Sequence, residues 1–248
     1  MVDRKIRVGA VSYLNTKPFI HGLQQEPISR DIELILAYPA RLVNMLKNDE
    51  IDIGLVPVGA LPGLGEYHIV SGYCIGTEGE VASVAVFSEV PMDEIETVYL
   101  DYQSRTSVLL CKLLFERHWK KEVRFIQAQD ESYIDQIKGK TAGLIIGDRA
   151  LMNRSKFPNV YDLGLGWKEM TGLPFVFAVW VHSREWSKET DAIFSAAISS
   201  GLKSLDNIAD NHAIGYYDLK HYYTHNISYQ LDDSKRKAIT EFLKLISQ

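Results

Sequence analysis

The sequence has little cysteine and no long apolar run, and each shortage excludes a class of protein. Its 248 residues include two cysteines, Cys74 and Cys111, without the spacing of a metal site, so we expect two reduced core residues and no disulfide. No stretch approaches the ~20 apolar residues of a membrane-spanning helix. The apolar segment after residues 1–8 is too short for the core of an export signal, since Ser12 and Asn15 interrupt it, which favours a cytoplasmic protein.

Basic charge is also scarce. The formal net charge at pH 7 is -5 and the lysines and arginines are scattered, so we expect neither a nucleic-acid-binding face nor a polybasic membrane contact. The seven histidines have no metal-ligand spacing, and the sequence lacks a Gly-x-Ser-x-Gly elbow, a P-loop and a dinucleotide-binding glycine pattern. An anionic ligand must therefore be recognised by local groups. Nothing in the sequence indicates an oligomeric state.

A hydrophobic content of 46% is ample for a packed core, and short β-branched runs alternate with helical patterns. Strands are expected at residues 6–11, 32–37, 53–57, 80–88, 97–100, 123–126, 142–146 and 172–181, and helices at 18–23, 39–47, 108–118, 191–208 and 233–246. This alternation predicts an α/β protein whose parallel strands are covered by helices. Pro18 and Pro39 suit the first turn of their helices, so the loops before them face the carboxyl edge of the sheet, where α/β proteins bind ligands.

The chain divides into two halves of similar organisation, each with a strand, a hydroxyl-rich turn and a helix. We therefore expect two α/β lobes: residues 1–90 and 175–248 form one, and residues 91–174 form the other. Strands that cross between such lobes leave a cleft into which helix N-termini point, which suits a small dianion. A ligand that bridges both lobes is expected to close this cleft.

The turn after the first strand is rich in polar groups. Asn15 can donate its amide to a hydroxyl or a carboxylate without titrating, or it can cap the helix that begins at Pro18. Ser12 and Thr16 are candidates for capping combined with ligand contact. Lys17 can neutralise a carboxylate, but a lysine just before a helix is more typical of a solvated surface position, which we expect here.

A second polar turn precedes the helix at 108–118. Ser104 is a natural cap, while the N–H and hydroxyl groups of Thr106 and Ser107 can bind a carboxylate with help from the positive helix end. Arg105 can pair with the same carboxylate, with Asp101, or with solvent.

Further polar positions accompany two apolar strands. Ser83 interrupts the run at 80–88, so its hydroxyl either bonds within the core or faces the cleft, because an unpaired buried hydroxyl costs about 1–3 kcal/mol. Gly147 and Asp148 follow the strand at 142–146, and Asp148 can orient a substrate hydroxyl or a water, cap the next helix, or pair with Arg149. A cluster of tyrosines at helical spacing is expected to pack against the sheet: Tyr216, Tyr217, Tyr222 and Tyr223.

Five motifs together resemble a known family. They are Ser-Tyr-Leu-Asn-Thr-Lys-Pro at 12–18, Gly-Glu-Val-Ala-Ser-Val at 79–84, Ser-Arg-Thr-Ser at 104–107, Ile-Gly-Asp-Arg-Ala at 146–150 and Thr-Gly-Leu-Pro-Phe-Val-Phe-Ala-Val-Trp at 171–180. In this order and spacing, over nearly the whole chain, they resemble the chorismate dehydratases of the futalosine route to menaquinone.

The resemblance implies a two-lobe, periplasmic-binding-protein-like (type II) fold used as a carbon–oxygen lyase. Such an enzyme dehydrates chorismate to 3-[(1-carboxyvinyl)oxy]benzoate, the first step of that route, with no metal or organic cofactor. The resemblance favours catalytic roles for Asn15 and Ser83, which would hold the substrate in its reacting geometry and assist departure of the C4 hydroxyl. With no evident imidazole or thiol base, we hypothesise that the enolpyruvyl carboxylate of chorismate removes the C3 proton.

Three alternatives compete with this interpretation. The enzyme that makes 1,4-dihydroxy-6-naphthoate in the same pathway has a similar architecture but a different polar motif at its opening. A solute-binding protein for a small carboxylate would share the fold, and it would be expected to carry an export signal. An effector domain of a transcription regulator would need a DNA-binding module.

Overall fold

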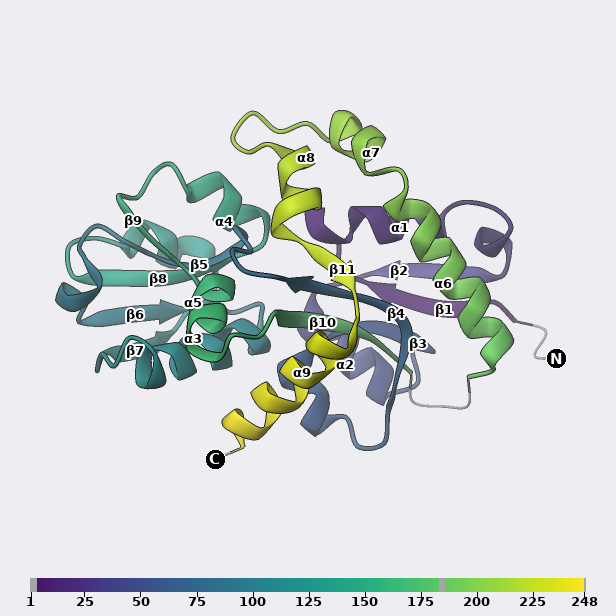
Figure 1. Cartoon of the computed structure of the whole chain (residues 1–248), viewed down its shortest axis with the longest axis horizontal. Helices are drawn as coiled ribbons and strands as arrows, with labels where there is room; N and C mark the ends of the chain where they lie inside the picture. The colour runs from purple at the N-terminus through teal and green to yellow at the C-terminus, as the bar shows by residue number, and fades with distance from the viewer. Residues whose placement is uncertain (1–3, 183–185, 248) are drawn as a thin grey trace.

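The apolar β-branched runs form two β-sheets, one at each end of the molecule (Figure 1). The structure is a computed structural model and describes residues 4–182 and 186–247. The first sheet has the strand order β11-β4-β10-β3-β1-β2. Its strands are β1 (Ile6–Ala10), β2 (Ile32–Leu36), β3 (Ile53–Pro57), β4 (His68–Thr77), β10 (Phe175–His182) and β11 (Ser228–Gln230). Strand β1 runs parallel to β2 and β3, while β10 is antiparallel to β3 and β4.

The second sheet has the order β7-β6-β8-β5-β9. Its strands are β5 (Val84–Ser88), β6 (Thr97–Leu100), β7 (Arg124–Gln127), β8 (Thr141–Ile146) and β9 (Asn159–Asp162). Strand β6 is parallel to β7 and β8, and β5 is antiparallel to β8 and β9. We call the first sheet with its helices the first lobe, and the second sheet with its helices the second lobe.

One strand lies on the other side of the expected division. Residues up to 90 were expected in lobe 1, but β5 pairs with β8 and β9 in the second sheet. All five residues of β5 are buried, so this apolar strand fits the interior of a sheet between two partners. The chain therefore crosses between the lobes from β4 to β5, and it returns into β10.

Helices cover both sheets. The first lobe carries α1 (Lys17–Leu23), α2 (Pro39–Lys47), α6 (Lys188–Leu202), α7 (Leu205–Asn211), α8 (Leu219–His221) and α9 (Asp233–Ile246). The second carries α3 (Arg105–Arg117), α4 (Asp148–Asn153) and α5 (Leu163–Thr171). Side-chain oxygens of Ser104 and Asp232 accept backbone N–H groups at the starts of α3 and α9, and this explains where these helices begin.

Close backbone contact joins α1 and α6. A Cβ atom on Gly22 would lie 2.0 Å from the carbonyl oxygen of Ala197, and one on Gly201 would lie 1.9 Å from that of Pro18. The two helices can therefore pack at this distance only with glycine at both positions. In the described part of the chain, no helix is long and apolar enough to span a bilayer.

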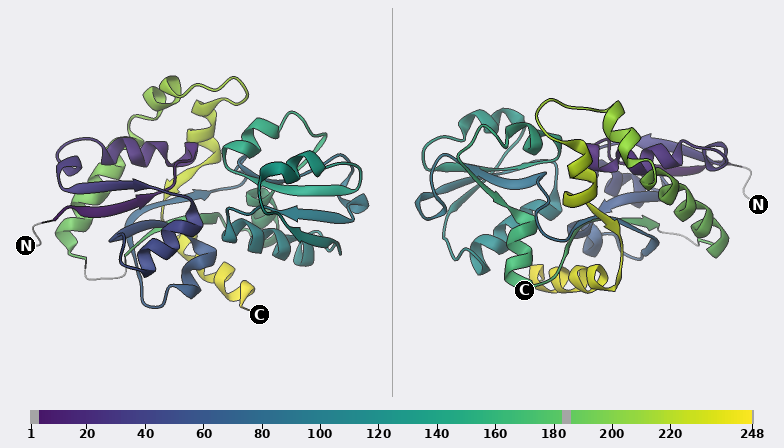
Figure 2. Two further views of the ribbon diagram at one scale, coloured as in Figure 1. Left: turned by 180° about the vertical axis from the view of Figure 1, so that it is seen from behind. Right: turned by 45° about the horizontal axis from the view of Figure 1, so that its top comes forward.

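The C-terminal segment is a feature that the sequence did not predict. From α8 the chain continues into a π-helical turn (Tyr222–Asn226) and then into β11. Both views in Figure 2 show this yellow-green segment between the two lobes. It therefore reaches residues of both lobes at the place where a ligand was expected.

Candidate active site

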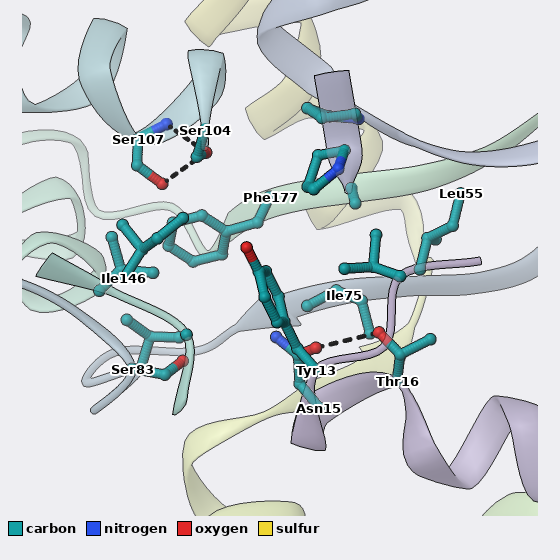
Figure 3. A pocket seen from close by; sticks show the side chains of 17 residues that line it. Tyr13, Asn15, Thr16, Leu55, Ile75, Ser83, Ser104, Ser107, Ile146 and Phe177 are labelled. Atoms are coloured by element: carbon teal, nitrogen blue, oxygen red, sulfur yellow. Dashed lines mark hydrogen bonds between the residues drawn. The ribbon is translucent and has the colours of Figure 1, made fainter. Parts of the chain in front are cut away.

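A cleft with a cavity volume of about 70 Å³ lies between the two lobes (Figure 3). The first lobe contributes Val11, Tyr13, Asn15, Thr16, Pro39, Leu55, Pro57, Ile75, Phe177 and Ala178. The crossover and the second lobe contribute Val81, Ser83, Val84, Ser104, Ser107, Ile146 and Gly147. None of these lining side chains is charged. A carboxylate in this cleft would therefore be bound by N–H, hydroxyl and amide groups, as the sequence predicted.

The amide of Asn15 is oriented by its neighbour. The Thr16 hydroxyl donates to Asn15 Oδ1 at 3.0 Å, and the Tyr229 hydroxyl donates to the backbone carbonyl of Asn15 at 3.0 Å. Figure 3 shows the amide nitrogen on the side that faces away from Thr16. The Asn15 side chain does not cap α1, because that helix has no side-chain cap bond at its start. Thr16 occupies Oδ1, and no described residue accepts a hydrogen bond from Nδ2, so the Nδ2 group can donate to a ligand.

Ser83 is presented by a strained turn. Its backbone nitrogen donates to the carbonyl of Val81 at 2.7 Å, and Ala82 between them has a φ of +62°. This bond closes a γ-turn with a positive φ, a conformation that costs about 1–3 kcal/mol and persists only where its surroundings hold it. The Gly147 nitrogen donates to the Ser83 carbonyl at 2.7 Å and adds to that support.

The carboxylate of Asp162 supplies most of the support for this turn. It accepts the N–H groups of Val81 and Ala82 at 3.1 and 2.8 Å, and it also caps α5. Arg154 donates to the Ala82 carbonyl at 2.9 Å. Burial raises the pKa of Asp162 to about 6, against the opposing effect of the N–H groups that it accepts. The position of Ser83 therefore depends on a carboxylate that does not itself line the cleft.

Tyr222 is a site residue that sequence analysis missed. Its hydroxyl donates to Ser83 Oγ at 2.8 Å, and both side chains are buried. We expected this tyrosine only to pack against the sheet. The apolar surroundings of Ser83 indicated that its hydroxyl needed a partner, but they did not indicate which one.

The N-terminus of α3 provides a second group of donors. Ser104 Oγ accepts the Ser107 N–H at 3.2 Å, which confirms its predicted role as the cap, and it donates to Ser107 Oγ at 2.9 Å. The Ser107 hydroxyl hydrogen can therefore point to a ligand. The first N–H groups of a helix lack intrahelical partners and carry partial positive charge, so this helix end favours an anion.

Two predicted binders on this turn lie elsewhere. Thr106 Oγ1 accepts the Gly59 N–H at 2.9 Å and donates to the Phe177 carbonyl at 3.4 Å, so it joins the lobes and does not line the cleft. Arg105 is exposed and lies outside the cleft lining. Its suggested partner Asp101 is held instead by Arg149 at 2.7 Å.

Ser12 and Asp148 also fall outside the lining. Ser12 is exposed. Asp148 neither caps α4 nor pairs with Arg149, because its Oδ1 accepts the Leu14 N–H at 3.0 Å. Gly147, in contrast, does line the cleft, with a φ of +64°, and a Cβ at this position would lie 3.5 Å from the Tyr13 ring. This backbone conformation requires glycine.

Within residues 4–182 and 186–247, no group of three or more His, Cys, Asp or Glu side chains is arranged to hold a metal ion. Cys74 and Cys111 are both buried and free, which confirms their predicted place in the core. The expectation that the reaction uses no cofactor stays a prediction.

Solved structures identify the class of fold. A crystal structure of a protein from Archaeoglobus fulgidus superimposes with a TM-score of 0.74 at 15% identity, covering 100% of this chain and 98% of that chain. A Candida albicans protein, described as having the generic periplasmic binding protein fold, gives a TM-score of 0.64 at 11% identity, covering 98% and 90%. The predicted two-lobe, periplasmic-binding-protein-like fold is thereby confirmed.

Sequence comparison then identifies the family. The profile of a family described as menaquinone biosynthesis matches residues 6–248, and the chain belongs to this family. A chorismate dehydratase of Thermus thermophilus is 27% identical over 263 aligned positions, which cover 96% of this chain and 94% of that protein. A chorismate dehydratase of Campylobacter jejuni is 32% identical over 105 positions, 41% of this chain and 47% of that protein.

Proposed function

We propose that this protein is a carbon–oxygen lyase that dehydrates chorismate to 3-[(1-carboxyvinyl)oxy]benzoate in menaquinone biosynthesis. The family and the two related dehydratases support this proposal. The observation that carries it is the position of Asn15 and Ser83, which line one uncharged cleft between the lobes. Chorismate carries two carboxylates and a leaving hydroxyl, and the cleft offers donors from both lobes for these groups.

The reaction is driven mainly by the substrate itself. The C3 proton and the C4 hydroxide leave as one water, and the electron pair of the C3–H bond completes an aromatic ring. Because aromatisation drives the reaction, the enzyme mainly has to orient the substrate and assist the two departures. In our proposal the enolpyruvyl carboxylate of the substrate takes the C3 proton.

The roles of the lining residues follow from their free donors. Asn15 Nδ2 and the Ser83 hydroxyl assist the departing C4 hydroxyl, while the Ser107 hydroxyl and the free N–H groups at the N-terminus of α3 bind a carboxylate. Ser104 acts through the Ser107 hydroxyl to which it donates. Thr16 acts through the Asn15 amide that it orients.

We propose that the lobes, with β5 in the second, close on the substrate and exclude water. We place the enzyme in the cytoplasm, a location that the two free, buried cysteines favour. Its partner is a small molecule rather than a nucleic acid or a membrane.

The test is to incubate the purified protein with chorismate, without metal or cofactor, and to identify the products by chromatography and mass spectrometry. Loss of one water to give the aromatic enolpyruvyl ether is the expected result. Unchanged chorismate that raises the melting temperature of the protein would contradict the lyase and favour a binding protein or the related naphthoate-forming enzyme.

A further inference from the structure

Two tyrosine hydroxyls from one C-terminal segment reach the two proposed catalytic residues. Tyr222 donates to Ser83 Oγ at 2.8 Å, and Tyr229 donates to the backbone carbonyl of Asn15 at 3.0 Å. Both tyrosines are buried. Ser83 directly precedes β5 and Asn15 follows β1, so a single segment contacts the side chain of one residue and the backbone of another that lies far away in the chain.

The direction of the Tyr222 bond decides what Ser83 can do. A phenol is a stronger acid than an alkyl hydroxyl, so Tyr222 is the donor and Ser83 Oγ the acceptor. Ser83 then retains its own hydroxyl hydrogen. No other group in the described ranges bonds to Ser83 Oγ, and this residue lines the cleft.

We propose that Tyr222 is a positioning residue that holds Ser83 as a hydrogen-bond donor directed into the cleft. The Ser83 hydroxyl donates to an oxygen of the bound substrate, which in our account is the departing C4 hydroxyl. This inference rests on the proposed function for the identity of the substrate, but not for the orientation of Ser83.

The surroundings of Tyr222 suit this role. It begins a π-helical turn, a rare conformation that is frequent at functional sites. The far end of that turn is tied down, because Asn226 donates to the Glu80 carbonyl at 3.2 Å and accepts from Tyr217 at 3.0 Å. Burial raises the pKa of the Tyr222 phenol, so it stays protonated and remains a donor.

The chain offers a matched control in Tyr223. This residue is also buried on the π-helical turn, but its hydroxyl has no partner among the described residues. Tyr222→Phe and Tyr223→Phe each remove one buried hydroxyl and keep the ring. They differ in whether Ser83 loses its partner.

The test compares the rate of chorismate turnover by these variants in the wild-type and Ser83→Ala backgrounds. We expect Tyr222→Phe to lower kcat about tenfold or more with little change in KM, because the donor is no longer held in place. In the Ser83→Ala background the same substitution should have no further effect. Tyr223→Phe should retain the wild-type kcat.

A crystal structure of unliganded Tyr222→Phe completes the test. Ser83 should leave its single rotamer or occupy several, whereas Tyr223→Phe should leave it unchanged. An unmoved Ser83 in Tyr222→Phe, or an equal loss of kcat in both backgrounds, would overturn the inference. If the wild type does not dehydrate chorismate, the proposed function fails, and the crystal structure still decides the orientation of Ser83.

Discussion

The carboxylate of Asp148 accepts a hydrogen bond from the backbone nitrogen of Leu14 at 3.0 Å, and this bond joins the two lobes beside the cleft. The Tyr13 hydroxyl makes a second bond between the lobes by donating to Gln103. Burial raises the pKa of Asp148, while the Leu14 N–H and the nearby charge of Lys17 act in the opposite direction. Asp148 therefore holds the lobes together instead of binding ligand from within the lining.

We expect Asp148→Ala to raise the KM for chorismate roughly three- to tenfold, because loss of one interlobe bond, worth about 1 kcal/mol, favours an open cleft. Asp148→Asn retains the Oδ1 acceptor and is the control. Steady-state kinetics and small-angle scattering with ligand would measure the effect. An unchanged KM together with normal compaction in Asp148→Ala would argue against this role.

Thr106 gives a prediction about stability rather than about binding. Thr106→Val leaves the buried Gly59 N–H without its acceptor, so the free energy of unfolding should fall by about 1–3 kcal/mol. The kcat of the folded fraction should stay near that of the wild type. Thr106→Ser keeps the hydroxyl and should recover most of the stability in urea denaturation. A large loss of kcat at full stability would instead return Thr106 to the substrate site.

Thr16 offers a test of how Asn15 is oriented. Thr16→Val preserves the shape of the side chain but removes the donor to Asn15 Oδ1, so the amide can turn over. We expect kcat to fall about two- to tenfold, since the net worth of such a bond is about 0.5–1.5 kcal/mol. Thr16→Ser should behave like the wild type. Equal rates for the valine and serine variants would show that the amide needs no such help.

Asp162 should give stability a specific dependence on pH. Its pKa rises from 3.8 to about 6 on folding, so the folded state binds the proton more tightly. The contribution of this group is therefore fully present below about pH 4 and is lost as pH rises through about 6. Across this window the loss amounts to about 3 kcal/mol.

Urea denaturation of the wild type and Asp162→Asn between pH 4 and pH 7 would measure this dependence. Because asparagine does not titrate, the stability of the wild type relative to the variant should decline as pH rises. A difference that stays constant across the range would contradict a raised pKa at Asp162.

Local patterns predicted those features that depend on neighbouring residues. The bounds of α2 and α9 match the expected helices, since Pro39 and Asp232 mark their first turns. Asn15 and Ser83 were placed through the family motifs, and both line the cleft. Their catalytic roles stay predictions.

Contacts between distant segments were not predictable in this way. The hydroxyls of Tyr222 and Ser83 are hydrogen-bonded although the two residues lie 139 positions apart in the sequence, and no periodicity connects them. Strand β4 was not predicted because its glycines are typical of a loop. At Gly76 the glycine instead allows close strand packing, since a Cβ there would lie 2.9 Å from the Phe175 carbonyl of the neighbouring strand. The expected helix at 191–208 is divided into α6 and α7 near Ser204.

The most direct measurement of the central claim is the rate of chorismate consumption by the wild type, Asn15→Ala and Ser83→Ala in one assay, with melting temperatures as a check on folding. Our account predicts conversion by the wild type and a loss of about a hundredfold or more in each folded variant, since each lacks a donor to the departing hydroxyl. Wild-type rates in both variants would show that the cleft between the lobes does not perform the dehydration in the way that we propose.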